Sequence, residues 1–315
     1  MSLPRCLDGK LELPVLGSPL FIVSGPELVI AQCKAGIVGS FPALNARPVE
    51  MLDQWLTRIE NELGEYQALH PEKKVAPYAV NQICHASNDR LMKDMETCVK
   101  HKVPVIITSL RPPAELVEAA HSYGGVVFHD VINVKHARKA AEQGVDGLIL
   151  VCAGAGGHAG MLSPFALVRE VKQWFKGTVL LSGAISDGWG IASALALGAD
   201  MAYMGTRFIA TAEAHAQDGY KQMIVDAGTA DIVYTPYFSG VNANYLRSSI
   251  AANGLNPDDV LGPRSGAKLS LGNDDDKGPK AWRDIWSAGQ GAGAIDDVPA
   301  VAALVDRLKT QYDAA

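Results

Sequence analysis

One glycine-rich segment places a single histidine where the backbone is open to a flat or phosphorylated ligand. Residues 153–160 read Ala-Gly-Ala-Gly-Gly-His-Ala-Gly and follow a short apolar run. Glycine has no Cβ, so a ligand can approach the backbone closely, and an imidazole can exchange a proton near neutral pH. A flexible connection with an exposed histidine is the alternative. Because so many glycines cost conformational entropy, we expect an active-site loop with His158 as its reactive group.

Two further segments have the composition of a phosphate site. Residues 182–188 read Ser-Gly-Ala-Ile-Ser-Asp-Gly, residues 205–208 read Gly-Thr-Arg-Phe, and each follows an apolar run. In many α/β barrels the loops after strands seven and eight bind phosphate through backbone N–H groups, a hydroxyl and a helix N-terminus. A tight turn would explain either segment alone. The two segments together predict a bound phosphate.

Polar residues at two other strand ends are weaker candidates. Asn81 ends the third apolar run, where its amide could hydrogen-bond a heterocycle or cap a loop. His129 and Asp130 end the fifth run. This imidazole and carboxylate could form a charged pair facing the barrel mouth, although a structural role explains His129 equally well. No two histidines have the spacing of metal ligands, so we expect no metal.

The segments that carry these residues alternate between strand and helix patterns. Eight short apolar runs are followed by longer segments with charged residues at helical spacing; the runs are 20–23, 37–40, 76–80, 103–108, 126–129, 147–151, 179–182 and 201–204. The intervening helices are predicted at 49–63, 89–100, 113–123, 134–143, 164–174 and 187–197. Little apolar–polar alternation within the runs indicates parallel strands covered on both faces. Eight such units, without an early Gly-x-Gly-x-x-Gly, predict an α/β fold of the (β/α)8 barrel type, with a flavodoxin-like sheet as the alternative.

The chain after the eighth run is too long for a single closing helix. Residues 207–286 contain two helical patterns, 214–227 and 243–253, and a polar stretch, 271–278, that is typical of a solvated loop. We therefore expect a barrel formed by residues 1–206 and 287–315, with 298–311 as its closing helix. The remaining residues, 207–286, would form a helical insertion after strand eight that covers the barrel mouth.

Composition restricts the class of protein. The 315 residues are 48% hydrophobic and 20% charged with a net charge of −6, which suits a packed core and offers no basic surface for nucleic acid. The five cysteines lack C-x-x-C spacing, which argues against a disulfide framework and indicates a reducing compartment. The N-terminus does not resemble a signal peptide, and no apolar run could span a membrane. We expect a cytoplasmic protein that binds neither nucleic acid nor a membrane.

Four motifs, in their order along the chain, resemble those of the nitronate monooxygenase family, formerly called 2-nitropropane dioxygenases. They are the segments 153–160 and 182–188, Met-Gly-Thr-Arg-Phe at 204–208, and Ser-Ala-Gly-Gln-Gly-Ala-Gly at 287–293. The resemblance runs from about residue 19 to the end. It implies a TIM barrel with an added helical domain, FMN as cofactor, and a flavoprotein monooxygenase active in nitroalkane detoxification.

The resemblance also implies a reaction. Alkyl nitronates, such as propionate 3-nitronate, would be oxidised with O2 to a carbonyl compound and nitrite. An imidazole can hold the nitro oxygens of a nitronate or act as a base on the neutral nitroalkane. Relatives of the family include FMN-dependent enoyl-ACP reductases and NADH:quinone reductases, so an FMN-dependent NAD(P)H:quinone or enoyl reductase is the alternative. A non-catalytic phosphate-binding barrel is a third possibility.

Carried over by motif, the resemblance assigns His158 as the catalytic residue. Together with His129 and Asp130 from the end of the fifth strand, the residues expected to contact FMN are Ser24, Gly25, Asn81, Gly156, Gly157, Gly183, Ala184, Gly205, Thr206 and Gln290. The chain departs from the family pattern in three places: Val-Ser-Gly-Pro at 23–26 replaces Ala-Pro-Met, Ala184 replaces a glycine, and Asp130 replaces a common lysine. The expected partners are a nitronate or nitroalkane and O2, and a homodimer is a candidate assembly.

Overall fold

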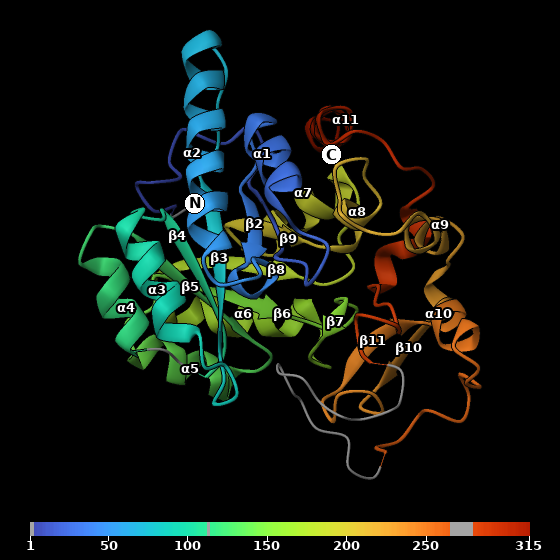
Figure 1. Cartoon of the computed structure of the whole chain (residues 1–315). Coiled ribbons are helices and arrows are strands. Elements are labelled where there is room, and N and C mark those ends of the chain that lie inside the picture. The colour runs from blue at the N-terminus through green and yellow to red at the C-terminus, as the bar shows by residue number, and fades with distance from the viewer. Residues whose placement is uncertain (1–2, 112–113, 265–279) are drawn as a thin grey trace.

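Eight parallel strands form a barrel at the centre of the molecule (Figure 1). The computed structural model describes residues 3–111, 114–264 and 280–315. The barrel strands are β1 (Val15–Gly17), β2 (Gly39–Pro42), β3 (Tyr78–Cys84), β4 (Val105–Leu110), β5 (Val126–Val131), β6 (Gly147–Val151), β8 (Thr178–Ser182) and β9 (Met201–Met204). They pair in the order β1-β9-β8-β6-β5-β4-β3-β2. Two hydrogen bonds close the ring, from Gly17 N–H to the Val38 carbonyl at 2.8 Å and from Val38 N–H to the Val15 carbonyl at 3.1 Å. The predicted (β/α)8 barrel is confirmed.

The first strand lies earlier in the chain than the sequence predicts. Residues 20–23 form a turn, in which Ser24 N–H donates to the Leu20 carbonyl at 2.9 Å and Ile22 has a φ of 68°. The side chain of Asn45 holds this turn by donating to the carbonyls of Leu20 and Ser24. The apolar run at 20–23 therefore marks the loop after β1 and not the strand itself.

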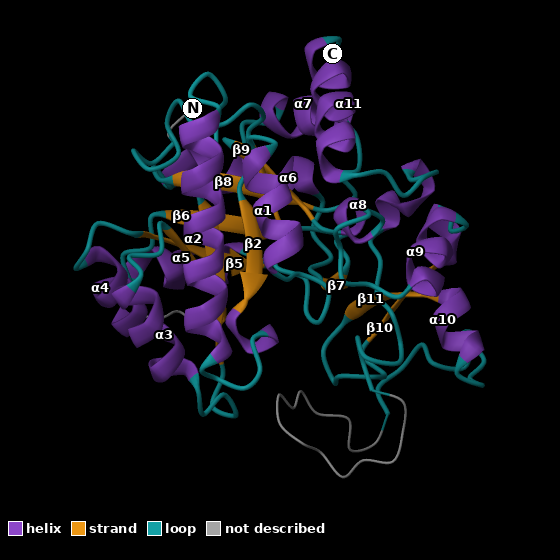
Figure 2. Cartoon of the chain, turned by 45° about the horizontal axis from the view of Figure 1, so that its top comes forward, coloured by secondary structure: helices purple, strands orange, loops and turns teal. Residues whose placement is uncertain are grey.

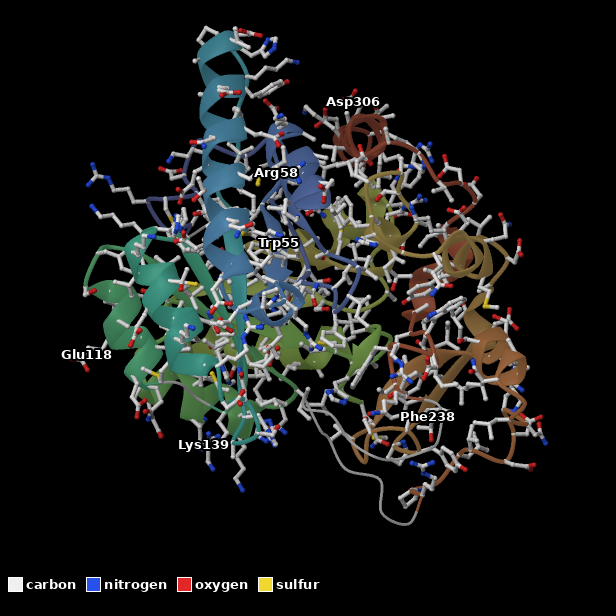
Figure 3. All side chains as sticks on the ribbon, in the orientation of Figure 1. Trp55, Arg58, Glu118, Lys139, Phe238 and Asp306 are labelled. Atoms are coloured by element: carbon white, nitrogen blue, oxygen red, sulfur yellow. The ribbon has the colours of Figure 1, made fainter. Side chains whose placement is uncertain are left out.

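Helices form a ring around the barrel (Figure 2). They are α1 (Pro26–Lys34), α2 (Met51–Leu69), α3 (Leu91–Lys100), α4 (Ala114–His121), α5 (Val134–Glu142), α6 (Pro164–Trp174), α7 (Gly188–Ala196) and α11 (Val301–Asp313). Each helix buries one face: α2 buries Leu52, Leu56, Ile59 and Leu63 at helical spacing. Figure 3 shows Glu118, Lys139 and Asp306 on the outside of this ring. In the described ranges no helix is both long and apolar enough to cross a membrane.

The barrel interior is packed and closed at the end where the strands begin. Inward-facing residues, including Val105, Ile107, Phe128 and Ile149, are fully buried in one cluster, and Leu7 from the N-terminal segment joins them. Neighbouring Cys6 lies near Asp146, which directly precedes β6. The N-terminal segment thus covers the lower end, and the carboxyl ends of the strands remain available for a site.

The chain after β9 forms a small sheet as well as helices. The helices are α8 (Thr206–Ile209), which begins one residue before the predicted insertion, α9 (Asp218–Val225) and α10 (Arg247–Ala252), and the strands are β10 (Ile232–Thr235) and β11 (Ala243–Leu246). The prediction of a helix from residue 243 is wrong for 243–246, because these residues pair with β10 and with the loop after β6, and this pairing outweighs local helical pattern. The predicted loop at 271–278 lies outside the described residues.

Candidate active site

His158 lies on a short strand that connects the barrel to the insertion. This strand, β7 (Gly157–His158), pairs antiparallel with β11, so that His158 lies opposite Ala243. The Asn244 side chain donates to the Ala155 carbonyl at 2.6 Å and fixes the preceding residues. The positive φ of Gly157, 68°, requires glycine at that turn. The glycine-rich loop is therefore an ordered element, held from the insertion side.

The imidazole of His158 is enclosed by residues of the insertion and of the segment after it. Its Nε2 lies 3.0 Å from the hydroxyl oxygen of Ser239, and its ring packs edge-on against Trp282 at a centroid distance of 4.9 Å. Burial lowers the pKa of His158 to about 4. The ring is therefore neutral at pH 7 and able to accept a proton.

The loops after β8 and β9 present a cluster of free backbone donors. Within the described part of the chain, no hydrogen bond occupies the N–H groups of Gly183, Ala184, Gly205 or Thr206. Gly183 and Ala184 both have positive φ, 137° and 54°. The four residues are partly or fully exposed at the carboxyl ends of two adjacent strands, so their N–H groups are available to a ligand. They form a cradle suited to an anion.

The four glycine-rich motifs meet beside this cradle. Thr206 Oγ1 accepts a hydrogen bond from Gly289 N–H at 2.8 Å, and Gln290 N–H donates to the Gly154 carbonyl at 2.9 Å. A Cβ on Gly154 would lie only 3.0 Å from Gln290 Oε1 and 3.2 Å from the Ala184 Cβ. Segments far apart in the sequence thus form one cluster at the barrel mouth.

A polar chain extends from β3 to β5 inside the barrel. Asn81 Nδ2 donates to Ser109 Oγ at 2.9 Å, and Ser109 Oγ donates to Asp130 Oδ2 at 2.5 Å. Asp130 follows the inward-facing Phe128 at the period of two that strands impose. Burial raises the pKa of Asp130 to about 6, against the opposing effect of the Ser109 hydrogen bond. Asn81 and Asp130 are thus brought together near the carboxyl ends of the strands.

His129 does not join Asp130 at the mouth. Because successive side chains point to opposite faces, His129 lies on the outer face of the barrel wall with Val127 and Val131. There it is 2% exposed and its Nδ1 lies 2.8 Å from Thr108 Oγ1. Burial lowers its pKa to about 4. The predicted charged pair is not formed, and the role left for His129 is structural.

The two residues expected from the first loop are buried. Ser24 is 1% exposed and its hydroxyl accepts a hydrogen bond from Leu20 N–H at 2.9 Å, while Gly25 caps the N-terminus of α1. The side chain of Ser24 is thus used within its own turn. Any contact of this loop with a ligand has to involve other atoms.

Sequence reasoning missed several residues around the site. Ser109 links Asn81 to Asp130, while Ser239 and Trp282 contact His158. Ser239 is separated from His158 by 81 residues, and no spacing in the sequence relates the two. Among the described residues, no group of three His, Cys, Asp or Glu side chains is arranged to hold a metal ion.

Comparison of the chain with known proteins identifies its family. The family model for nitronate monooxygenase matches residues 9–311. The chain belongs to the nitronate monooxygenase family. The nitronate monooxygenase of Paraburkholderia phytofirmans is 26% identical over 287 residues, which cover 78% of this chain and 77% of that protein. The protein is therefore an enzyme, an oxidoreductase of a flavin-dependent family.

Two other similarities extend the comparison. A (3aS,4S,5R,7aS)-5-hydroxy-7a-methyl-1-oxo-octahydro-1H-indene-4-carboxyl-CoA dehydrogenase of Mycobacterium tuberculosis is 29% identical over 245 residues, covering 76% of this chain and 64% of that protein. The structure of a point mutant of FabK from Thermotoga maritima superimposes with a TM-score of 0.76 at 25% identity, covering 100% of this chain and 97% of that one. The similarity to FabK shows a shared barrel fold over the whole chain.

Proposed function

We propose that the protein is an FMN-dependent nitronate monooxygenase that oxidises alkyl nitronates, such as propionate 3-nitronate, with O2 to a carbonyl compound and nitrite. The observation that carries this proposal is the neutral imidazole of His158, held on β7 in the loop whose Gly156 lies against the loop after β9: a Cβ on Gly156 would lie 3.2 Å from Thr206 Oγ1. A base would be needed to convert a neutral nitroalkane to its nitronate, and an anion site would be needed to hold the phosphate of FMN.

The cradle fits the terminal phosphate of FMN. Free donors at Gly183, Ala184, Gly205 and Thr206 would hold that phosphate, in the loops where barrels commonly bind one. The remaining contacts proposed are Gly156, Gly157 and Gln290 beside the flavin, with Asn81 and Asp130 below it. When bound, the flavin supplies the electron transfer between the nitronate and O2.

His158 is the residue proposed to act on the substrate. On a neutral nitroalkane, the imidazole removes the proton from the α-carbon, and the electron pair moves into the nitro group to give the nitronate. On a preformed nitronate no proton has to be removed, and the same ring holds a nitro oxygen. Trp282 packs edge-on against the imidazole and keeps water from that side of the ring.

We propose a division into a barrel, residues 1–206 and 287–315, and an insertion, residues 207–286. Pairing of β7 with β11 supports a role of the insertion in positioning the catalytic loop, in addition to covering the mouth. Removing the insertion would therefore be expected to disorder His158 as well as to open the site.

An FMN-dependent NAD(P)H:quinone or enoyl reductase is the second candidate. It is favoured by the similarity to a CoA dehydrogenase and by Asp130, which occupies a position where the family commonly has lysine. A carboxylate cannot attract an anionic nitronate as a lysine would, so this substitution bears on the choice of substrate.

The proposed function is tested by the bound cofactor and the products. We expect the purified protein to be yellow, and heat to release FMN. We also expect propionate 3-nitronate to be converted to nitrite with consumption of O2. Release of FAD, or failure of the apoprotein to bind any flavin, would contradict the assignment of the phosphate cradle.

A further inference from the structure

Ser239 contacts His158 from the turn between β10 and β11. Ser239 is 3% exposed, and its hydroxyl oxygen lies 3.0 Å from His158 Nε2. The same hydroxyl lies 3.0 Å from the carbonyl oxygen of Val241, to which it can only donate. The buried phenol of Tyr245 also interacts with this hydroxyl, and its O–H can donate to Ser239 Oγ. The Val241 carbonyl and His158 Nε2 therefore compete for the one serine proton.

The single proton of the hydroxyl decides which ring nitrogen of His158 is protonated. Ser239 can satisfy both contacts only by donating to the Val241 carbonyl and accepting from Nε2–H. A neutral imidazole carries one proton, so Nδ1 then holds the lone pair. Nδ1 has no hydrogen-bond partner in the described part of the chain, and it is not among the atoms sealed from solvent without a partner.

We propose that Ser239 is a positioning residue that fixes the tautomer of His158, leaving Nδ1 as the basic nitrogen that faces the substrate. This inference rests on the proposed role of His158 as a base. It adds a residue of the insertion to the catalytic arrangement, because the orienting partner comes from outside the barrel.

The turn that carries Ser239 is held on several sides. Gly240 N–H donates to the Pro236 carbonyl at 2.8 Å, and Tyr237 N–H donates to Thr235 Oγ1 at 3.1 Å. The ring of Phe238, which Figure 3 labels in the insertion, packs edge-on against Tyr245 at a centroid distance of 4.9 Å. The hydroxyl of Ser239 is therefore in a fixed position before the substrate binds.

The fixed tautomer assigns a path to the proton. The α-C–H bond of the nitroalkane breaks, an Nδ1–H bond forms, and the electron pair of the broken bond moves into the nitro group. The resulting imidazolium has two N–H groups. One keeps its bond to Ser239, and the other points to the nitronate that has just formed.

The direct test is the protonation state of the ring nitrogens. Protein labelled with ¹⁵N-histidine and loaded with its flavin is examined by NMR at pH 7, and His158→Gln assigns the signals. We expect a protonated Nε2 and an unprotonated Nδ1 in the wild type, and a mixture of tautomers in Ser239→Ala. A protonated Nδ1 in the wild type, or no change in Ser239→Ala, would overturn the proposal.

Kinetics separate positioning from a general structural role. We expect Ser239→Ala to slow turnover of a neutral nitroalkane by about tenfold to a hundredfold, as when a histidine loses an orienting partner, and to change turnover of the preformed nitronate far less. Ser239→Thr keeps the hydroxyl and should restore the rate. Equal losses on both substrates, without rescue by threonine, would make Ser239 merely structural.

A matched control is a second buried serine of the insertion. Ser249 is 1% exposed and accepts a hydrogen bond from Trp286 N–H at 2.8 Å, without contacting His158. Ser249→Ala should leave the His158 tautomer unchanged, and an equal shift there would count against Ser239. If the wild type turns over neither substrate, the proposed function fails, while the NMR signals still decide the tautomer.

Discussion

The imidazole of His158 combines two properties that a surface histidine lacks. Burial lowers its pKa to about 4, so the ring stays neutral throughout the physiological range. Gly156, which is exposed, and Gly157, which is half-buried, directly precede it, and a Cβ on Gly157 would meet only Trp282 Nε1, at 3.8 Å. The neutral ring has a nitrogen lone pair free to accept a proton, while its lowered pKa makes it a weaker base than a free imidazole.

Replacing this imidazole should affect one substrate more than the other. We expect His158→Asn to lower turnover of a neutral nitroalkane by about 10²–10⁴-fold, the range for loss of a general base, with FMN still bound. Turnover of a preformed nitronate should fall less, because only a contact to the nitro group is lost. Steady-state rates on both substrates measure this. Near-wild-type rates on both would remove His158 from the mechanism.

Asp130 should make stability depend on pH. Its pKa is raised to about 6 in the folded protein, above the unfolded value near 3.8, because burial disfavours the carboxylate. The folded state therefore holds the proton more tightly, and this stabilising contribution is lost as the pH rises from about 4 to 6.

We expect Asp130→Asn to gain stability relative to the wild type over this pH window. The gain should approach about 1–3 kcal/mol at pH 7 and vanish below about pH 4. Urea denaturation of both proteins at several pH values measures it. A difference in unfolding free energy that does not change with pH would show that the carboxyl group titrates normally.

At the scale of elements, the parallel strands and the loops after them were predictable from the sequence. The pairing of strands that lie far apart in the sequence was not. The apolar runs at 147–151 and 201–204 coincide with β6 and β9 because buried parallel strands are apolar throughout. β7 contains only Gly157 and His158, and it exists because β11 pairs with it. The side of the wall that His129 faces depends on strand register, which a run of apolar residues does not reveal.

The same limit applies to the partners of the site. Glycine, serine and threonine after β8 and β9 predicted the anion cradle because their position in a barrel is fixed by the repeat. No motif or position in the barrel repeat identifies Ser109 or Ser239 as a residue of the site. Their roles depend on which side chains the strands and the insertion bring within hydrogen-bond distance.

The loop after β8 should tolerate no side chain at Gly183. Its φ is 137°, and a Cβ there would lie 2.8 Å from the Ala153 carbonyl oxygen. We expect Gly183→Ala to weaken FMN binding and to cost about 1–3 kcal/mol of stability. Flavin fluorescence titration and urea denaturation measure the two effects.

Gly124 provides a matched control for that loop. It also has a positive φ, 84°, but a Cβ there would meet nothing within 4 Å. Gly124→Ala should lose about 1 kcal/mol of stability and retain FMN. Equal loss of FMN in both variants would show that the effect reflects general destabilisation and not the cradle.

At the scale of the whole molecule, the proposed site draws on the barrel and on residues 207–286. The barrel supplies the anion cradle and the polar chain to Asp130, whereas the insertion supplies the strand that orders His158 and the serine beside it. Figure 1 shows β10 and β11 beside the barrel, next to β7. In the proposed function, reaction specificity would depend on both parts, and the central question is whether a nitronate or a nicotinamide reduces the flavin.

Anaerobic stopped-flow mixing of the flavin-loaded protein with propionate 3-nitronate, and separately with NADH, tests this choice most directly. Flavin absorbance reports reduction by either compound before O2 takes part. No Gly-x-Gly-x-x-Gly follows the first strand, and the proposed role of His158 is to hold a nitro group, so we predict faster flavin reduction by the nitronate than by NADH. Rapid reduction by NADH with negligible reduction by the nitronate would contradict the account and assign the protein to the reductases.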